Sequence, residues 1–182
     1  MRDHILISIR ITIALLVITC GIYPALVWAV GQVAFHHQAN GSLIQRNGRV
    51  IGSELIAQEF AGDRYFHSRP SAAGYDGSAS GGSNLGPTSK KLADRIAADA
   101  RALGGRSVPA DAVTTSASGL DPHISPEYAL SQAPRVAHAR EIELSRIHAL
   151  VVSHTEHRFL GIFGEPRINV LLLNLALDRG VS

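Results

Sequence analysis

Cysteine is nearly absent from this chain. The single residue, Cys20, lies among aliphatic side chains near the N-terminus. The rest of the chain therefore has no pair of thiols that could form a disulfide. We expect its folded part to depend on a hydrophobic core alone.

An excess of charge of either sign is also lacking. The chain has 17 basic and 15 acidic residues, a net charge of +2. Two of the basic residues, Arg2 and Arg10, and one acidic residue, Asp3, precede His36, so the part that follows has a net charge of +1. A nucleic-acid partner requires a basic face, so we expect none.

A complete nucleotide or metal motif is missing as well. The glycines of Gly81–Thr88 are spaced as in a phosphate-binding loop, but Pro87 stands where the lysine belongs, which removes an ammonium and a backbone donor. His154 and His157 are three residues apart instead of four, and Glu156 does not follow the first of them. We therefore expect neither a nucleotide site nor a bound metal.

The residue types of a hydrolytic triad are present, but without the sequence motif that usually accompanies them. Asp121, His123 and Ser125 occur together, yet no Gly-x-Ser-x-Gly elbow accompanies them. A serine directly before Pro126 is better explained as a helix cap. A membrane-anchored hydrolase or metal-dependent enzyme outside the cytoplasm, using His123, His154 and His157, remains the alternative hypothesis.

What the sequence does contain is one long apolar run. No residue from Ile11 to Val30 carries a formal charge, and twenty residues at about 1.5 Å rise span roughly the 30 Å of a bilayer core. Arg2 and Arg10 precede this run, whereas the next basic residue is Arg46. The excess of basic residues before the span predicts a cytoplasmic N-terminus.

A cleaved signal peptide is the rival interpretation of this run. Ala29-Val30-Gly31 is an acceptable cleavage site, but the run is longer than the apolar part of a typical signal peptide. We therefore expect a single-pass membrane protein. It would have a cytoplasmic stub at residues 1–10, a membrane helix at 11–34 and an extracytoplasmic α+β domain at 35–182.

Small residues are spaced by four within the predicted membrane helix. Gly21, Ala25 and Ala29 share one helical face, along which another helix could approach closely. Small residues are common in membrane helices in any case. A packing face and a purely compositional stripe both remain open.

The first part of the predicted domain combines a hairpin, a long loop and a helix. Asn47-Gly48 between two apolar pairs predicts a β-hairpin, because both residues accept positive φ. Tyr65–Pro87 is rich in glycine, serine and proline and predicts an irregular loop, whose length suggests function or packing against another surface. Ser89–Leu103 has helical periodicity, either Thr88 or Ser89 to cap its start, and two glycines that end it.

The second part predicts further helices and a buried end. Val108–Thr115 alternates as a strand does, and Ser125-Pro126-Glu127 opens a helix that Pro134 interrupts or restarts. Glu141–His154 predicts another helix. The apolar run Ile168–Leu177 is too short to cross a membrane and predicts a buried helix or strand.

Several of these segments, taken together, resemble one known family. The chain is similar to the C subunits of the Kdp potassium-transporting P-type ATPase, nearly from end to end and in the same order. Ala117 stands where the family pattern has glycine. The segments that carry the resemblance are 23–24, 38–44, 65–76, 80–89, 119–126 and 164–171.

The resemblance implies a non-catalytic accessory subunit of an ATP-driven potassium importer. In such a complex a channel-like A subunit binds potassium, a B subunit hydrolyses ATP and a small F subunit is also present. The C subunit has no cofactor of its own and is described as a chaperone that raises the ATP affinity of the B subunit. A periplasmic domain cannot reach cytoplasmic ATP, so this effect would have to be transmitted through the membrane span or another subunit.

We expect the polar loops to form the contact with these partners, beside the potassium entrance. The candidate contact residues are Arg69, Ser71, Tyr75, Asp76, Ser83, Asn84, Asp121 and His123.

Overall fold

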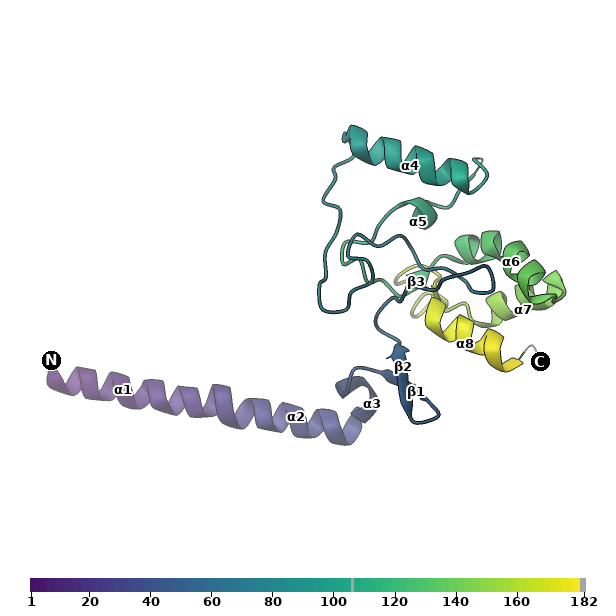
Figure 1. The fold of residues 1–182 in the computed structure, drawn as a ribbon. Coiled ribbons are helices and arrows are strands. Elements are labelled where there is room, and N and C mark those ends of the chain that lie inside the picture. Colours follow the sequence, from purple (N-terminus) through teal and green to yellow (C-terminus); the bar gives the residue numbers. More distant parts are fainter. Residues whose placement is uncertain (106, 181–182) are drawn as a thin grey trace. The chain divides into compact units, whose positions relative to one another are not determined.

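A computed structural model describes residues 1–105 and 107–180 of the chain. The chain divides into two compact units, Met1–Leu43 and Ile44–Ser182. The described residues combine helices with short strands, which confirms the predicted α+β class (Figure 1).

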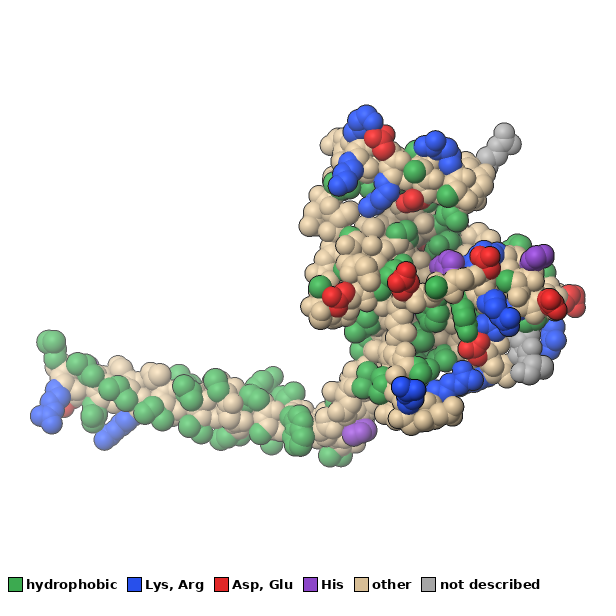
Figure 2. All heavy atoms as spheres, in the orientation of Figure 1, with side chains coloured by type: hydrophobic (Ala, Val, Ile, Leu, Met, Phe, Trp, Pro, Cys, Tyr) green, Lys and Arg blue, Asp and Glu red, His purple; other side chains and the backbone are tan. Residues whose placement is uncertain are grey.

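The N-terminal unit is dominated by one uninterrupted helix, which consists of α1 (Arg2–Leu16), a π-helical stretch (Val17–Ile22) and α2 (Tyr23–Ala34). The short helix α3 (His36–Ala39) follows it. The long helix runs for 33 residues from Arg2 to Ala34 and is long and apolar enough to cross a membrane. No residue in its most apolar 18-residue stretch is buried. Apolar side chains cover this helix along its length (Figure 2). The predicted stub at residues 1–10 continues the same helix.

The π-helical stretch lies immediately before Pro24. A proline has no N–H and its ring clashes with the carbonyl four residues earlier, here that of Cys20. A wider turn relieves this clash, and the backbone N–H of Tyr23 bonds to the carbonyl of Ile18, five residues back. The helix therefore passes the proline without a break.

The predicted hairpin, β1 (Leu43–Arg46) paired with β2 (Arg49–Ser53), begins at the last residue of the first unit and otherwise belongs to the second. Asn47 and Gly48 have φ values of 53° and 75°. These are the positive angles that a two-residue hairpin turn requires. The long loop that follows contains no helix or strand before residue 90, in agreement with the sequence.

Helix α4 (Lys90–Ala102) confirms the next prediction, since Ser89 caps it by accepting a 3.4 Å hydrogen bond from the N–H of Leu92. The strand predicted at Val108–Thr115 is wrong. Its centre forms a single helical turn, α5 (Ala110–Val113), in which the neighbouring residues Ala112 and Val113 are both buried. A strand would turn these adjacent side chains to opposite faces, whereas the helical turn lets both join the same core cluster.

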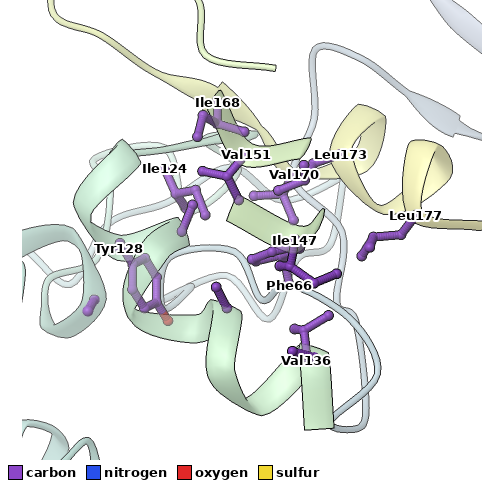
Figure 3. Close-up of a cluster of buried hydrophobic side chains, with 14 of the residues drawn as sticks. Phe66, Ile124, Tyr128, Val136, Ile147, Val151, Ile168, Val170, Leu173 and Leu177 are labelled. Atoms are coloured by element: carbon purple, nitrogen blue, oxygen red, sulfur yellow. The ribbon is translucent and has the colours of Figure 1, made fainter. Parts of the chain in front are cut away.

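Three helices and a two-residue strand pair enclose the core. β3 (His123–Ile124) pairs antiparallel with β4 (Ile168–Asn169), and the helices are α6 (Pro126–Arg140), α7 (Leu144–Ser153) and α8 (Val170–Gly180). Figure 3 shows Phe66 and Ile147 within this cluster, among side chains from α6, α7 and α8. The apolar run after residue 167 therefore supplies both a buried strand and a buried helix.

Two helix predictions need correction. Helix α6 continues through Pro134 because the carbonyl that the proline leaves unbonded belongs to Leu130, an exposed residue that water can reach. The next helix begins at Leu144 and not at Glu141, because Glu141 adopts a left-handed conformation, with φ of 58°, that ends α6.

Candidate functional site

The glycine- and serine-rich loop is anchored at its start by two side-chain amides. The buried Asn174 of α8 accepts a 2.8 Å hydrogen bond from the N–H of Phe66 and donates a 2.9 Å bond to its carbonyl. Gln132 of α6 does the same for His67, at 2.8 and 3.1 Å. These amides satisfy the backbone groups of an extended segment where no strand lies beside it.

Two arginines of α6 bind the carbonyls just before this segment. Arg135 donates to the carbonyls of Asp63 and Tyr65 at 2.8 and 3.0 Å, and burial lowers the pKa of its guanidinium despite the opposing charge of Asp63. Arg140 donates to the carbonyl of Arg64 at 2.6 Å and lies 4.8 Å from the ring centroid of Tyr65. Neither role was apparent from the sequence.

Arg69 and Asp121, both predicted contact residues, join two loops. A guanidinium nitrogen of Arg69 lies 3.2 Å from a carboxylate oxygen of Asp121, and the other terminal nitrogen donates to the hydroxyl of Thr114 at 3.3 Å. The backbone N–H of His123 donates to Asp121 at 3.0 Å. Burial raises the pKa of the Asp121 carboxyl, but the hydrogen bonds from His123 and the charge of Arg69 together lower it below its ordinary value.

Ser71 and Tyr75 fix the next turn of the same loop. The hydroxyl of Ser71 donates to the carbonyl of Gly119 at 2.6 Å and accepts from the N–H groups of Ala73 and Tyr75 at 3.1 and 3.0 Å. The hydroxyl of Tyr75 donates to the carbonyl of Arg69 at 2.8 Å. Burial, followed by the charge of Glu59, raises the pKa of this tyrosine. Both side chains therefore hold the loop together.

Glycines allow the two loops to approach closely at this point. A Cβ atom on Gly82 would lie 2.8 Å from the carbonyl oxygen of Ala117, and one on Gly119 would lie 2.6 Å from that of Gly81. The apparent phosphate-loop spacing is therefore explained by backbone packing. Ala117 itself is exposed, so its side chain is accommodated.

The other predicted contact residues lie further out. Asp76 is exposed and accepts hydrogen bonds from the hydroxyl and N–H of Ser78, which lower the pKa of its carboxyl. Ser83 is half-buried and bonded to Thr115 at 3.3 Å, whereas Asn84 is exposed, with φ of 52°. Asp76 and Asn84 thus offer more of their side chains to solvent than Ser71 or Tyr75.

Beside Arg69 and Asp121 lies an open cleft of about 570 Å³. Its lining includes Arg69, Asp121 and His123 from the loops, and Phe159, Phe163 and Arg167 from residues 156–167. The cleft therefore combines charged groups with two aromatic rings.

No catalytic triad is assembled here. The hydroxyl of Ser125 donates to Asp111 at 3.0 Å and accepts from the N–H of Tyr128 at 3.0 Å, so it caps α6 as the sequence predicts. His123 and His157 line the cleft, but His154 lines a different hollow beside α7. Among the described residues, no group of three or more His, Cys, Asp or Glu side chains comes together as metal ligands would.

The small residues of the N-terminal helix remain on its surface. Gly21, Ala25 and Ala29 are exposed, and a Cβ atom on Gly21 would meet nothing within 4 Å. A shallow apolar hollow of about 500 Å³ lies at Gly21 and Ala25.

The sequence interpretation missed one exposed element, a hairpin at residues 156–167. It projects four large apolar side chains, those of Phe159, Leu160, Ile162 and Phe163. The available signal was an uncharged apolar run centred on Gly161 and bordered by charged residues.

These observations define a class of protein: a small domain carried on one apolar helix, with its loops fixed by internal bonds and no catalytic group assembled among residues 1–105 and 107–180. Comparison with known proteins identifies the family. Residues 5–179 match the family model of the K+-transporting ATPase c chain, KdpC.

Curated relatives agree over nearly the full length. The KdpC subunit of Koribacter versatilis is 49% identical, covering 98% of this chain and 95% of the relative. That of Gemmatimonas aurantiaca is 53% identical, over 98% and 94%, and that of Rhodospirillum rubrum is 55% identical, over 91% and 90%. The chain therefore belongs to the KdpC family.

Proposed function

We propose that this chain is the non-catalytic accessory subunit of a bacterial Kdp pump, in which other subunits carry potassium and hydrolyse ATP. The match to the KdpC family over residues 5–179 carries this proposal. The relatives that it matches over nearly their whole lengths are potassium-transporting ATPase KdpC subunits. The hydrolase alternative has no support, because Ser125 and the three histidines do not form a site.

The proposed topology follows from the apolar helix and its charges. The uncleaved helix Arg2–Ala34 would cross the inner membrane once, with Arg2 and Arg10 in the cytoplasm. The second unit would then lie in the periplasm. Gly21, Ala25 and Ala29 would provide a face for close approach of a partner helix.

The proposed partners are the channel-like A subunit, the ATP-hydrolysing B subunit and the small F subunit. The chain would bind no cofactor of its own, and its loops would lie beside the potassium entrance, where backbone carbonyl oxygens favour cations. ATP binding would belong to the B subunit. The chain would alter turnover by binding one conformation of the pump more tightly than another, since only differential affinity shifts an equilibrium.

Potassium-stimulated ATP hydrolysis tests the proposal. The pump is produced with and without this chain, and ATPase activity is measured against potassium concentration. We expect activity to fall strongly without the chain, while the chain alone hydrolyses nothing. Full activity in its absence would contradict the accessory role, and hydrolysis by the isolated chain would contradict its non-catalytic nature.

A further inference from the structure

The 156–167 hairpin has a rigid stem. Glu156 and Arg167 exchange backbone hydrogen bonds of 2.8 and 3.0 Å, and their side chains pair at 2.9 Å. Phe159 and Phe163 exchange bonds of 2.9 and 3.0 Å nearer the tip. Arg158 also pairs with Glu165. The apolar tip is therefore held out by a defined scaffold.

The tip exposes an unusual amount of apolar surface. Phe159, Leu160, Ile162 and Phe163 are 71%, 74%, 72% and 63% exposed. The tip itself carries no charge. Contiguous apolar patches of more than a few hundred Å² are uncommon on monomeric proteins and typically mark binding surfaces.

The turn at the tip is strained in a way that folding does not explain. Ile162 donates to the carbonyl of Phe159 at 3.1 Å, and the central residues Leu160 and Gly161 have φ values of 53° and 72°. Leucine rarely adopts positive φ, whereas asparagine does so readily. Leu160 therefore combines an unfavourable backbone angle with a side chain that is 74% exposed and adds nothing to the core of this domain.

The surroundings of the tip favour a protein partner over a lipid surface. The charges of the stem are balanced, since Arg158 and Arg167 each pair with a glutamate. Insertion into a bilayer would bring the largely exposed Glu165 to the headgroup phosphates, whereas lipid-binding elements are rich in basic residues. Phe159 and Phe163 also line the open cleft of about 570 Å³ that Arg69 and Asp121 line. Protein side chains can fill such a hollow.

We infer that the tip of the 156–167 hairpin docks into an apolar depression on another protein subunit of the Kdp complex, with the adjoining cleft receiving a segment of that subunit. The inference rests on the proposed function. Two exposed aromatic residues beside a half-buried arginine ion pair are typical of the residues that dominate interface energy. The contact thus centres on the hairpin and reaches Arg69, Asp121 and His123 through the cleft.

Co-purification of the complete complex tests this docking. The ATP-hydrolysing subunit carries an affinity tag, and the variant combines Leu160→Asn with Phe163→Ser. The matched control is Val152→Ser, which removes an apolar side chain that is 67% exposed and belongs to α7 and not to the hairpin. We expect retention of the variant to fall roughly tenfold, as loss of an interface anchor does. The control should behave as wild type.

A photo-crosslinking side chain at position 160 identifies the occupant. We expect an adduct with another subunit, and none when the probe is at position 152. Adducts with lipid alone, or with a second copy of this chain, would overturn the inference. Thermal unfolding of the full-length chain must show an undiminished midpoint for Leu160→Asn, since asparagine relieves the turn.

The outcomes separate the two proposals. Equal retention of the variant and wild type would overturn the docking and leave the accessory function intact. Failure of the wild-type chain to co-purify at all would overturn the accessory function and with it the docking.

Discussion

The loop that starts at Tyr65 and the hairpin at 156–167 reverse what their compositions suggest. The loop is rich in small and polar residues, yet its start is buried: Phe66 and Ser68 are 0% and 5% exposed, and side chains from α6 and α8 bind the backbone of Phe66 and His67. The hairpin tip is apolar, yet it is exposed, and its backbone groups bond to each other. Burial at the start of the loop thus involves partners for the backbone as well as hydropathy.

The largest expected effect is loss of the amide that anchors the loop. Asn174→Ala would leave two buried backbone groups of Phe66 unsatisfied, which should lower the free energy of unfolding by about 3 kcal/mol. Denaturant unfolding of the full-length chain in detergent, followed by circular dichroism, would measure it. The control Asn84→Gly removes an exposed amide at a residue with φ of 52°, which glycine accepts, and should change little. If the two substitutions lowered the free energy of unfolding equally, the amide of Asn174 would not be the anchor of the loop.

A smaller, pH-dependent effect is expected at Asp121. Its pKa lies below the ordinary value in the folded protein, so the ionised group stabilises the fold above the unfolded pKa of about 3.9. This contribution is lost as the pH falls through the folded pKa. Asp121→Asn should cost about 1–2 kcal/mol of unfolding free energy at pH 7.

Unfolding measured from pH 7 down to pH 3 would check the sign. The deficit of Asp121→Asn should shrink as the pH falls, whereas Asp94→Asn, in an exposed pair with Lys90, should show little deficit at any pH. A deficit at Asp121 that stays constant with pH would show that the carboxylate charge is not responsible.

The smallest effect is expected at two turns whose central residues have similar φ angles. Asn47-Gly48 and Leu160-Gly161 both have two positive φ values, but only the first pair suits them. Leu160→Asn should raise the free energy of unfolding by about 1 kcal/mol and Asn47→Leu should lower it by a similar amount. Denaturant unfolding of both variants provides the measurement. Changes of the same sign would mean that strain at the tip is not what separates the turns.

These two turns also show how far sequence could predict the fold. Asn-Gly signals a hairpin by local chemistry, and Ser89 and Ser125 signal caps in the same way, so those elements were confirmed. Leu160-Gly161 carries no such signal, because its angles contradict the preference of leucine. The one-turn helix α5 was mistaken for a strand because its burial depends on packing by distant elements.

The candidate contact residues were predictable only in part. Arg69 and Asp121 are brought together as a pair. The sequence could not reveal that the hydroxyls of Ser71 and Tyr75 donate to backbone carbonyls of the loops. Asn174 is one of two asparagines in the apolar run Ile168–Leu177, and nothing in the sequence indicates that its partner is Phe66. Such contacts depend on tertiary structure and leave no periodic pattern.

The hydrogen bonds between Asn174 and Phe66 affect how the protein can fold during its synthesis. The two residues are separated by 108 positions, so a ribosome adds Phe66 long before the helix that holds it. By then the N-terminal apolar helix has long been available for insertion, whereas the loop still lacks its partners. A nascent chain that stops before α8 would therefore be anchored yet unable to close its core. Such a chain would be open to proteolysis at the membrane.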